Sequence, residues 1–83
     1  AAWLYDQGKP CGEAANAAKH FCAEAGFHAA ETAVLTHGGM GFAKEYHVER
    51  LFRESMLPRI APVSQNLALC FIAEKVLGLP KSY

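Results

Sequence analysis

The spacing of apolar and polar positions along the chain predicts an all-helical protein. Apolar and small residues recur at intervals of three and four across residues 11–36, which is the period of one face of a helix. No stretch shows a convincing alternation at every second position, as a strand would. The long segment is also rich in alanine, which has the highest helix propensity. The recurring positions predict a buried stripe made of Ala14, Ala18, Phe21, Cys22, Ala25, Ala29 and Ala33.

Glycine and proline punctuate the rest of the chain into further helices. Gly8 and Gly78 each follow a helical segment as stop signals, and the glycines at residues 38–41 interrupt the long helix. Pro58 is expected to end a helix, because it lacks a donor and disfavours helix in the residue before it. The predicted helices cover residues 1–7, 11–36, 45–57 and from 63 or 64 to 77, with 59–62 as a linker. Together they predict an antiparallel all-α bundle.

Opposite charges lie four residues apart on the third predicted helix. Glu49 precedes Arg53, and Arg50 precedes Glu54, which predicts two ion pairs on a solvated face. Such exposed pairs contribute about 0.3–0.5 kcal/mol each. An alternative is that an arginine near the glycine turn meets a cofactor phosphate in a bidentate way.

Composition excludes several classes of function. The 83 residues are 52% hydrophobic and 19% charged, which excludes a disordered tail. Eight basic and eight acidic residues balance, so we expect no nucleic-acid partner. The longest strongly apolar stretch, residues 67–73, is far shorter than the ~20 residues of a membrane span. No secretion signal is visible, so we expect a cytoplasmic (bacterial) or mitochondrial-matrix protein that is not secreted.

The size of the chain predicts that it is part of something larger. A domain this small buries only about 60% of its unfolded surface. The sequence also opens inside a predicted helix, and we expect apolar surface that other parts of the protein cover. The cysteines, Cys11, Cys22 and Cys70, do not form a disulfide scaffold, which indicates a reducing compartment.

Candidate chemistry is sparse when judged from the residues alone. A glycine-rich turn can bring backbone N–H groups against a phosphate, but residues 38–41 match no known nucleotide-binding pattern and are also typical of a structural turn. His20, Glu24 and His28 share one helix face, either as a solvent-facing polar stripe or, less readily, as part of a metal site. We predict no metal, and no catalytic triad can be argued from spacing.

Residues 36–53, with the sequence THGGMGFAKEYHVERLFR, resemble the acyl-CoA dehydrogenase family. The whole chain is similar to the C-terminal helical domain of such a flavoenzyme, over residues 1–83. The resemblance implies missing N-terminal helical and middle β domains, and FAD held between domains and against a neighbouring subunit of a homodimer or homotetramer. It also implies oxidation of an acyl-CoA to the 2-enoyl-CoA, with electrons passing to electron-transferring flavoprotein.

The resemblance implies an FAD-binding segment just before and within the glycine turn. The family's Q-x-x-G-G segment, which touches the FAD pyrophosphate of the adjacent subunit, aligns with Leu35, Thr36, His37, Gly38 and Gly39. Both glycines match, whereas Leu35 replaces the glutamine and has no amide. The implied contact is therefore one made by the backbone.

A second implied segment follows the family's catalytic E-G-T-[SA]-[EQ] turn. It aligns with Pro62, Val63, Ser64, Gln65 and Asn66. Ser64, Gln65 and Asn66 are the implied cofactor contacts, and Val63 lies on the substrate side. Pro62 stands where the family has its glutamate base and cannot abstract a proton. The resemblance therefore implies no catalytic residue in this chain and a base on an earlier helix, upstream of Ala1.

Three hypotheses follow from these features. The first is a part of an FAD-dependent acyl-CoA dehydrogenase. The second is a non-catalytic oligomerisation or binding module of a dehydrogenase-like protein, suggested by the missing glutamate and glutamine. The third, an independent helical adaptor, fits the composition but leaves the order of the motifs unexplained.

Overall fold

The computed structural model describes residues 1–81, and these residues form helices and turns without any strand. Residues 12–37, the long alanine-rich segment, form a single helix, as its period predicted. The elements in chain order are α1 (Ala2–Asp6), α2 (Gly12–His37), the 3-10 helix η1 (Gly38–Phe42), α3 (Val48–Ser55), α4 (Leu57–Ile60) and α5 (Gln65–Lys75). The predicted all-α class is confirmed.

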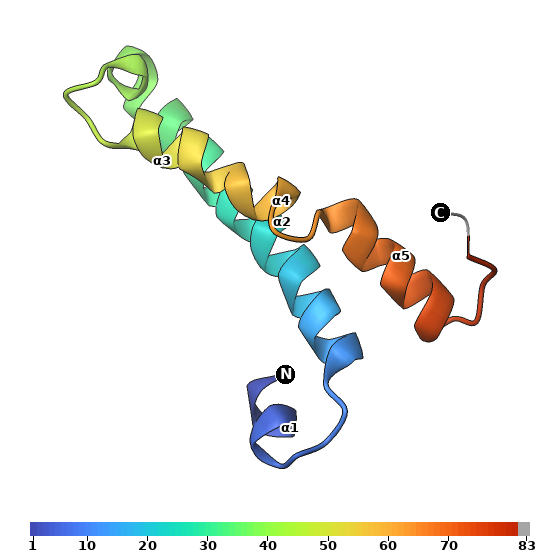
Figure 1. Ribbon diagram of the computed structural model, residues 1–83. Helices are drawn as coiled ribbons and strands as arrows, with labels where there is room; N and C mark the ends of the chain where they lie inside the picture. The colour runs from blue at the N-terminus through green and yellow to red at the C-terminus, as the bar shows by residue number, and fades with distance from the viewer. Residues whose placement is uncertain (82–83) are drawn as a thin grey trace.

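The elements are arranged along α2, which is the axis of the molecule (Figure 1). The chain reverses at η1, and α3 and α4 run back antiparallel to the C-terminal half of α2. Helix α5 then bends away beside the N-terminal half, where Phe71 lies against Gly12. The radius of gyration is 16.4 Å, against about 12 Å for a compact domain of this length. The antiparallel arrangement is therefore open and elongated.

The core of the described residues is thin. Ala23 and Ala68 are the buried apolar side chains, at 3% and 0% exposure. Large apolar side chains remain exposed at the same time, including Tyr5 at 74%, Leu35 at 72% and Phe42 at 90%. The predicted exposure of apolar surface is confirmed.

The face of α2 that packs differs from the predicted stripe. Phe21 is 69% exposed, and Cys22 and Ala25 are exposed as well. Ala23, which was not part of the predicted stripe, is buried. Partly buried positions also follow the spacing of another face, at Asn16, His20, Phe27, Ala30 and Val34. Of the predicted stripe, Ala14 and Ala33 are partly buried and the other five members are exposed. Alanine lies on every side of this helix, so the hydrophobic pattern could not choose the face.

Pro58 does not end a helix, and the prediction that it would is wrong. It lies in the first turn of α4, where a missing N–H removes no helical hydrogen bond. Met56 has helical angles (φ −69°, ψ −31°), so α4 continues almost directly from α3. The linker is therefore displaced by two residues from the predicted 59–62 to 61–64, and it begins at Ala61, which is extended and precedes a cis Ala61–Pro62 bond.

One segment has the length and composition of a membrane span. Within Val48–Lys75, a window of 18 residues reaches a mean hydropathy of 1.2. A spanning helix needs about 20 consecutive residues whose backbone groups bond within the helix. In the structure this segment is divided into α3, α4 and α5, and residues 61–64 between the last two are not helical. In this conformation it is not a continuous span.

Candidate functional site

The paired glycines leave their backbone uncovered at the end of α2. Gly38 has the backbone angles φ +58° and ψ −136°, which residues other than glycine rarely adopt. Its N–H donates to the carbonyl of Leu35. A Cβ added at Gly38 or at Gly39 would meet no atom within 4 Å. The segment forms η1 instead of an irregular turn, and its first two residues face open space.

Gly41 is where the chain comes closest to itself. A Cβ there would lie 2.3 Å from the backbone oxygen of Val34, and Gly41 is buried. Real Cβ atoms essentially never approach another atom so closely. The close backbone approach that glycine permits is therefore used at Gly41 to fold η1 against α2.

The polar side chains just before the glycines bond to carbonyls of their own helix. The Thr36 hydroxyl donates to the Thr32 carbonyl at 2.7 Å, and His37 Nδ1 lies 2.8 Å from the Ala33 carbonyl. A carbonyl only accepts, so Nδ1 carries the proton and Nε2 of a neutral His37 ring is an acceptor. Thr36 and a neutral His37 therefore have no free side-chain donor for an anion at this end of α2.

A hollow of about 430 Å³ lies between the end of α2, η1 and α3. Its lining is mostly apolar, with charged side chains from α3 and the loop before it. The lining residues are Val34, Gly41, Phe42, Lys44, Glu49, Phe52 and Arg53. The hollow therefore gathers aromatic and charged groups beside Gly41, at the end of η1 that follows Gly38 and Gly39.

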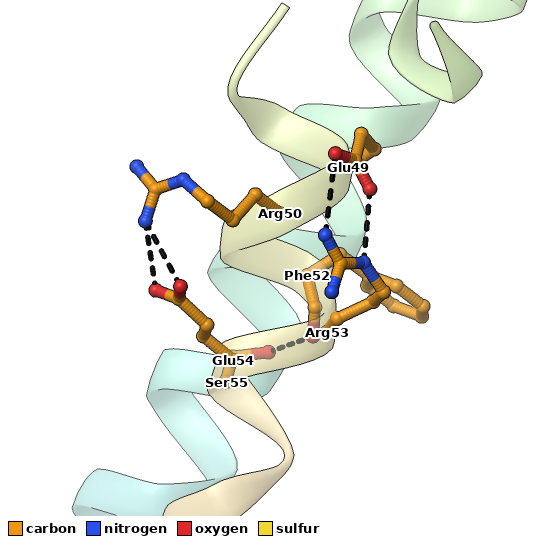
Figure 2. A network of polar contacts seen from close by, with 6 residues as sticks. All are labelled: Glu49, Arg50, Phe52, Arg53, Glu54 and Ser55. Atoms are coloured by element: carbon orange, nitrogen blue, oxygen red, sulfur yellow. Dashed lines mark hydrogen bonds and ion pairs between the residues drawn. The ribbon is translucent and has the colours of Figure 1, made fainter. Parts of the chain in front are cut away.

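The charged residues of α3 form the two predicted ion pairs, which Figure 2 shows side by side. Arg53 Nε donates to Glu49 Oε2 at 2.9 Å, and Arg50 Nη1 donates to Glu54 Oε2 at the same distance. The hydrogen bond from Arg53 lowers the pKa of the Glu49 carboxyl. These arginines are engaged along their own helix, so a bidentate phosphate contact would require breaking a pair.

A second group of predicted site residues begins α5. The Ser64 hydroxyl accepts a hydrogen bond from the Leu67 N–H at 3.2 Å and caps the helix. Asn66 is exposed, and Val63 is 38% exposed. Beside them lies a hollow of about 300 Å³, lined by Met56, Arg59, Ile60, Ser64, Gln65 and Asn66.

The side chain of Gln65 points into the chain and is 8% exposed. Its oxygen accepts from Arg59 Nε at 2.7 Å, and its nitrogen donates to Glu24 Oε1 at 2.8 Å and to the His20 carbonyl at 3.2 Å. We call Gln65, Glu24, Arg59 and His20 the Gln65 cluster. Because both amide hydrogens have partners, a contact between Gln65 and a cofactor would have to come from its backbone.

An ion pair and a cation–π contact also stabilise the Gln65 cluster. Arg59 donates to Glu24 Oε1 at 2.8 Å and lies 4.7 Å from the ring centroid of Phe27. The hydrogen bond from Gln65 lowers the pKa of the Glu24 carboxyl, and the charge of Arg59 acts in the same direction. The cluster therefore joins α2, α4 and α5 through ionised and hydrogen-bonded groups.

The structure does not bring the two groups of site residues together. Gln65 lies beside His20 and Glu24 on α2, whereas Gly38 follows the end of that helix. Gly38 is 14 positions after Glu24, which corresponds to about 21 Å along the axis at 1.5 Å per residue. One copy of the chain therefore presents two separate surfaces to any cofactor.

The histidines and acids of α2 serve other contacts. Glu24 bonds Arg59 and Gln65, and His28 Nδ1 lies 3.5 Å from Glu31. Within residues 1–81, no group of three or more His, Cys, Asp or Glu residues could hold a metal ion.

Comparison with known proteins identifies the family. Residues 1–77 match the model described as "Acyl-CoA dehydrogenase, C-terminal domain". The chain belongs to the acyl-CoA dehydrogenase family. It is 48% identical over its whole length to acyl-CoA dehydrogenase FadE12 of Mycobacterium tuberculosis, covering 22% of that protein.

Other members of the acyl-CoA dehydrogenase family align over nearly the same region. An acyl-CoA dehydrogenase of Bacillus subtilis is 37% identical over 94% of this chain and 21% of its own length. Cyclohexane-1-carbonyl-CoA dehydrogenase of Geobacter metallireducens is 35% identical over 93% of this chain and 20% of its own. The chain thus spans about a fifth of these relatives. No solved structure matches it.

Sequence reasoning missed the residues that hold the predicted site residues at the start of α5 in place. Lys19 and Glu24 lie off the predicted stripe, so the sequence pattern gave them no place in the packing of α2. In the structure Lys19 Nζ donates to the carbonyls of Pro58 and, at 2.9 Å, of Ala61. Nothing local in the sequence relates residue 19 to residues 58–61, so only a solved arrangement of α2 and α4 could reveal the contact.

Proposed function

We propose that this chain is the C-terminal helical domain of an FAD-dependent acyl-CoA dehydrogenase, and that it contributes flavin and subunit contacts. The observation that carries the proposal is the uncovered backbone of Gly38 and Gly39 beside the hollow at η1, in a chain of this family. The reaction proposed for the complete protein that contains this chain is oxidation of an acyl-CoA thioester to the 2-enoyl-CoA.

The residues present fit an FAD pyrophosphate at the glycine segment. No side chain covers Gly38 or Gly39, so a phosphate can approach their backbone, and Lys44 at the adjoining hollow adds positive charge. At the start of α5, Ser64 and Asn66 would contact another part of the same flavin or the flavin of another subunit. FAD would supply the hydride acceptor, and these residues would bind and orient it.

The base that removes the α-proton is proposed to lie outside this chain, since Pro62 has no group that can accept a proton. We propose acyl-CoA as substrate, a homodimer or homotetramer as the assembly, and electron-transferring flavoprotein as electron acceptor. The proposed compartment is the bacterial cytoplasm or the mitochondrial matrix.

Purification of the complete protein tests the proposal. We expect a yellow protein with flavin absorbance, which bleaches when saturated acyl-CoA thioesters are added without oxygen. A colourless protein that takes up no added FAD would refute the flavin assignment. Bound FAD that no thioester bleaches would favour the alternative suggested by Pro62, a non-catalytic oligomerisation or binding module.

A charge placed at Gly39 tests the contact itself. Gly39→Asp should weaken FAD binding about tenfold relative to Gly39→Asn, because the two side chains have the same shape and only aspartate repels the pyrophosphate. A Cβ at Gly39 meets nothing within 4 Å, so both side chains can be attached there without a clash at their first atom. FAD titration of the two apoproteins gives the ratio. Equal affinities would place the pyrophosphate elsewhere.

A further inference from the structure

The turn between α4 and α5, residues 61–64, is held against α2 by side chains that belong to α2 itself. We infer that Lys19 and Glu24 are positioning residues, which set where Val63, Ser64 and Asn66 meet the cofactor and substrate. This inference rests on the proposed function, because it concerns the surface that function assigns to the turn.

Lys19 holds the first part of the turn. Its ammonium group has three donors, and the structure directs it to the carbonyls of Pro58 and Ala61. Pro58 is in the first turn of α4, and Ala61 is the first residue after that helix. One side chain therefore takes up carbonyls at the end of α4, which no further helical turn can satisfy.

Glu24 holds the other side of the turn through the Gln65 cluster. Its Oε1 accepts from Arg59 on α4 and from Gln65, the first residue of α5. Arg59 and Gln65 also bond each other at 2.7 Å. The residues before and after the turn are thus tied to one carboxylate, five residues beyond Lys19 on α2.

Residues beside these attachment points are the ones offered to a ligand. Val63 is 38% exposed and Asn66 is exposed, whereas Gln65 between them is 8% exposed. The turn thus alternates an inward anchor with outward groups. Pre-organising such a segment strengthens binding, because the ligand does not have to order it.

Two variants of the complete protein test the inference, each with a matched control. Lys19→Met removes the donors but keeps the apolar stem, and Lys19→Arg should restore the contact. Glu24→Ala removes the shared carboxylate, and Glu31→Ala removes an acid of the same helix that pairs with His28 instead. The readouts are amide hydrogen exchange over residues 59–68 and FAD affinity.

We expect exchange over residues 59–68 to become about tenfold faster in Lys19→Met and Glu24→Ala, with FAD binding about two- to tenfold weaker. Lys19→Arg and Glu31→Ala should match the wild type, and far-UV circular dichroism should confirm that every variant is folded. Unchanged exchange, or faster exchange with unchanged FAD affinity, would overturn the inference. A wild-type protein without flavin would refute the proposed function instead, while the exchange data would still show whether Lys19 and Glu24 fix the turn.

Discussion

Substituting Gly41 with alanine is expected to destabilise the complete protein by about 3 kcal/mol, at the upper end of the usual penalty for overpacking. The added Cβ would lie 2.3 Å from the backbone oxygen of Val34 and 3.0 Å from its Cα. Backbone atoms of a helix cannot swing aside as a flexible side chain does, so η1 would have to separate from α2. Chemical denaturation followed by circular dichroism measures the loss.

Gly39→Ala is the matched control for this substitution. It introduces the same methyl group two residues earlier in the same 3-10 helix, where nothing lies within 4 Å and φ is not positive. We expect a change within about 0.5 kcal/mol, as for other unconstrained surface positions. If both variants lost the same stability, the close approach of Gly41 to α2 would be contradicted.

The second large effect is expected at Ala23, which is 3% exposed on the packed face of α2. Ala23→Leu should destabilise the complete protein by about 1–3 kcal/mol, because the extra carbons must push α2 away from the helices beside it. Thermal unfolding of the variant checks the direction, and denaturant unfolding gives the size.

Ala25→Leu is the control, since Ala25 lies two residues further along the same helix and is exposed in this chain. Both substitutions replace one strong helix former by another, so helix propensity is nearly unchanged. An unchanged stability at residue 23 would contradict the observed packing, whereas a loss at residue 25 would indicate that other parts of the complete protein cover that face of α2.

Part of the candidate site was predictable because its signals are local. The glycines at residues 38–41 indicated a break with close backbone approach, and the structure assigns the close approach to Gly41. The charges of α3 pair as their spacing of four predicted. The motif order also led to the acyl-CoA dehydrogenase family, while the roles of Gly38, Gly39 and Ser64 toward FAD stay predictions.

By itself the sequence determined the all-α class, the approximate limits of α1, α2 and α5, and the family, because helical period, glycine stops and motif order are properties of neighbouring residues. Only the tertiary structure decided which face of α2 packs and that Pro58 starts α4 instead of ending α3. It also decided that Lys19 and Glu24 hold the turn before α5. An alanine-rich helix offers similar faces all round, so long-range contacts between distant residues had to select one.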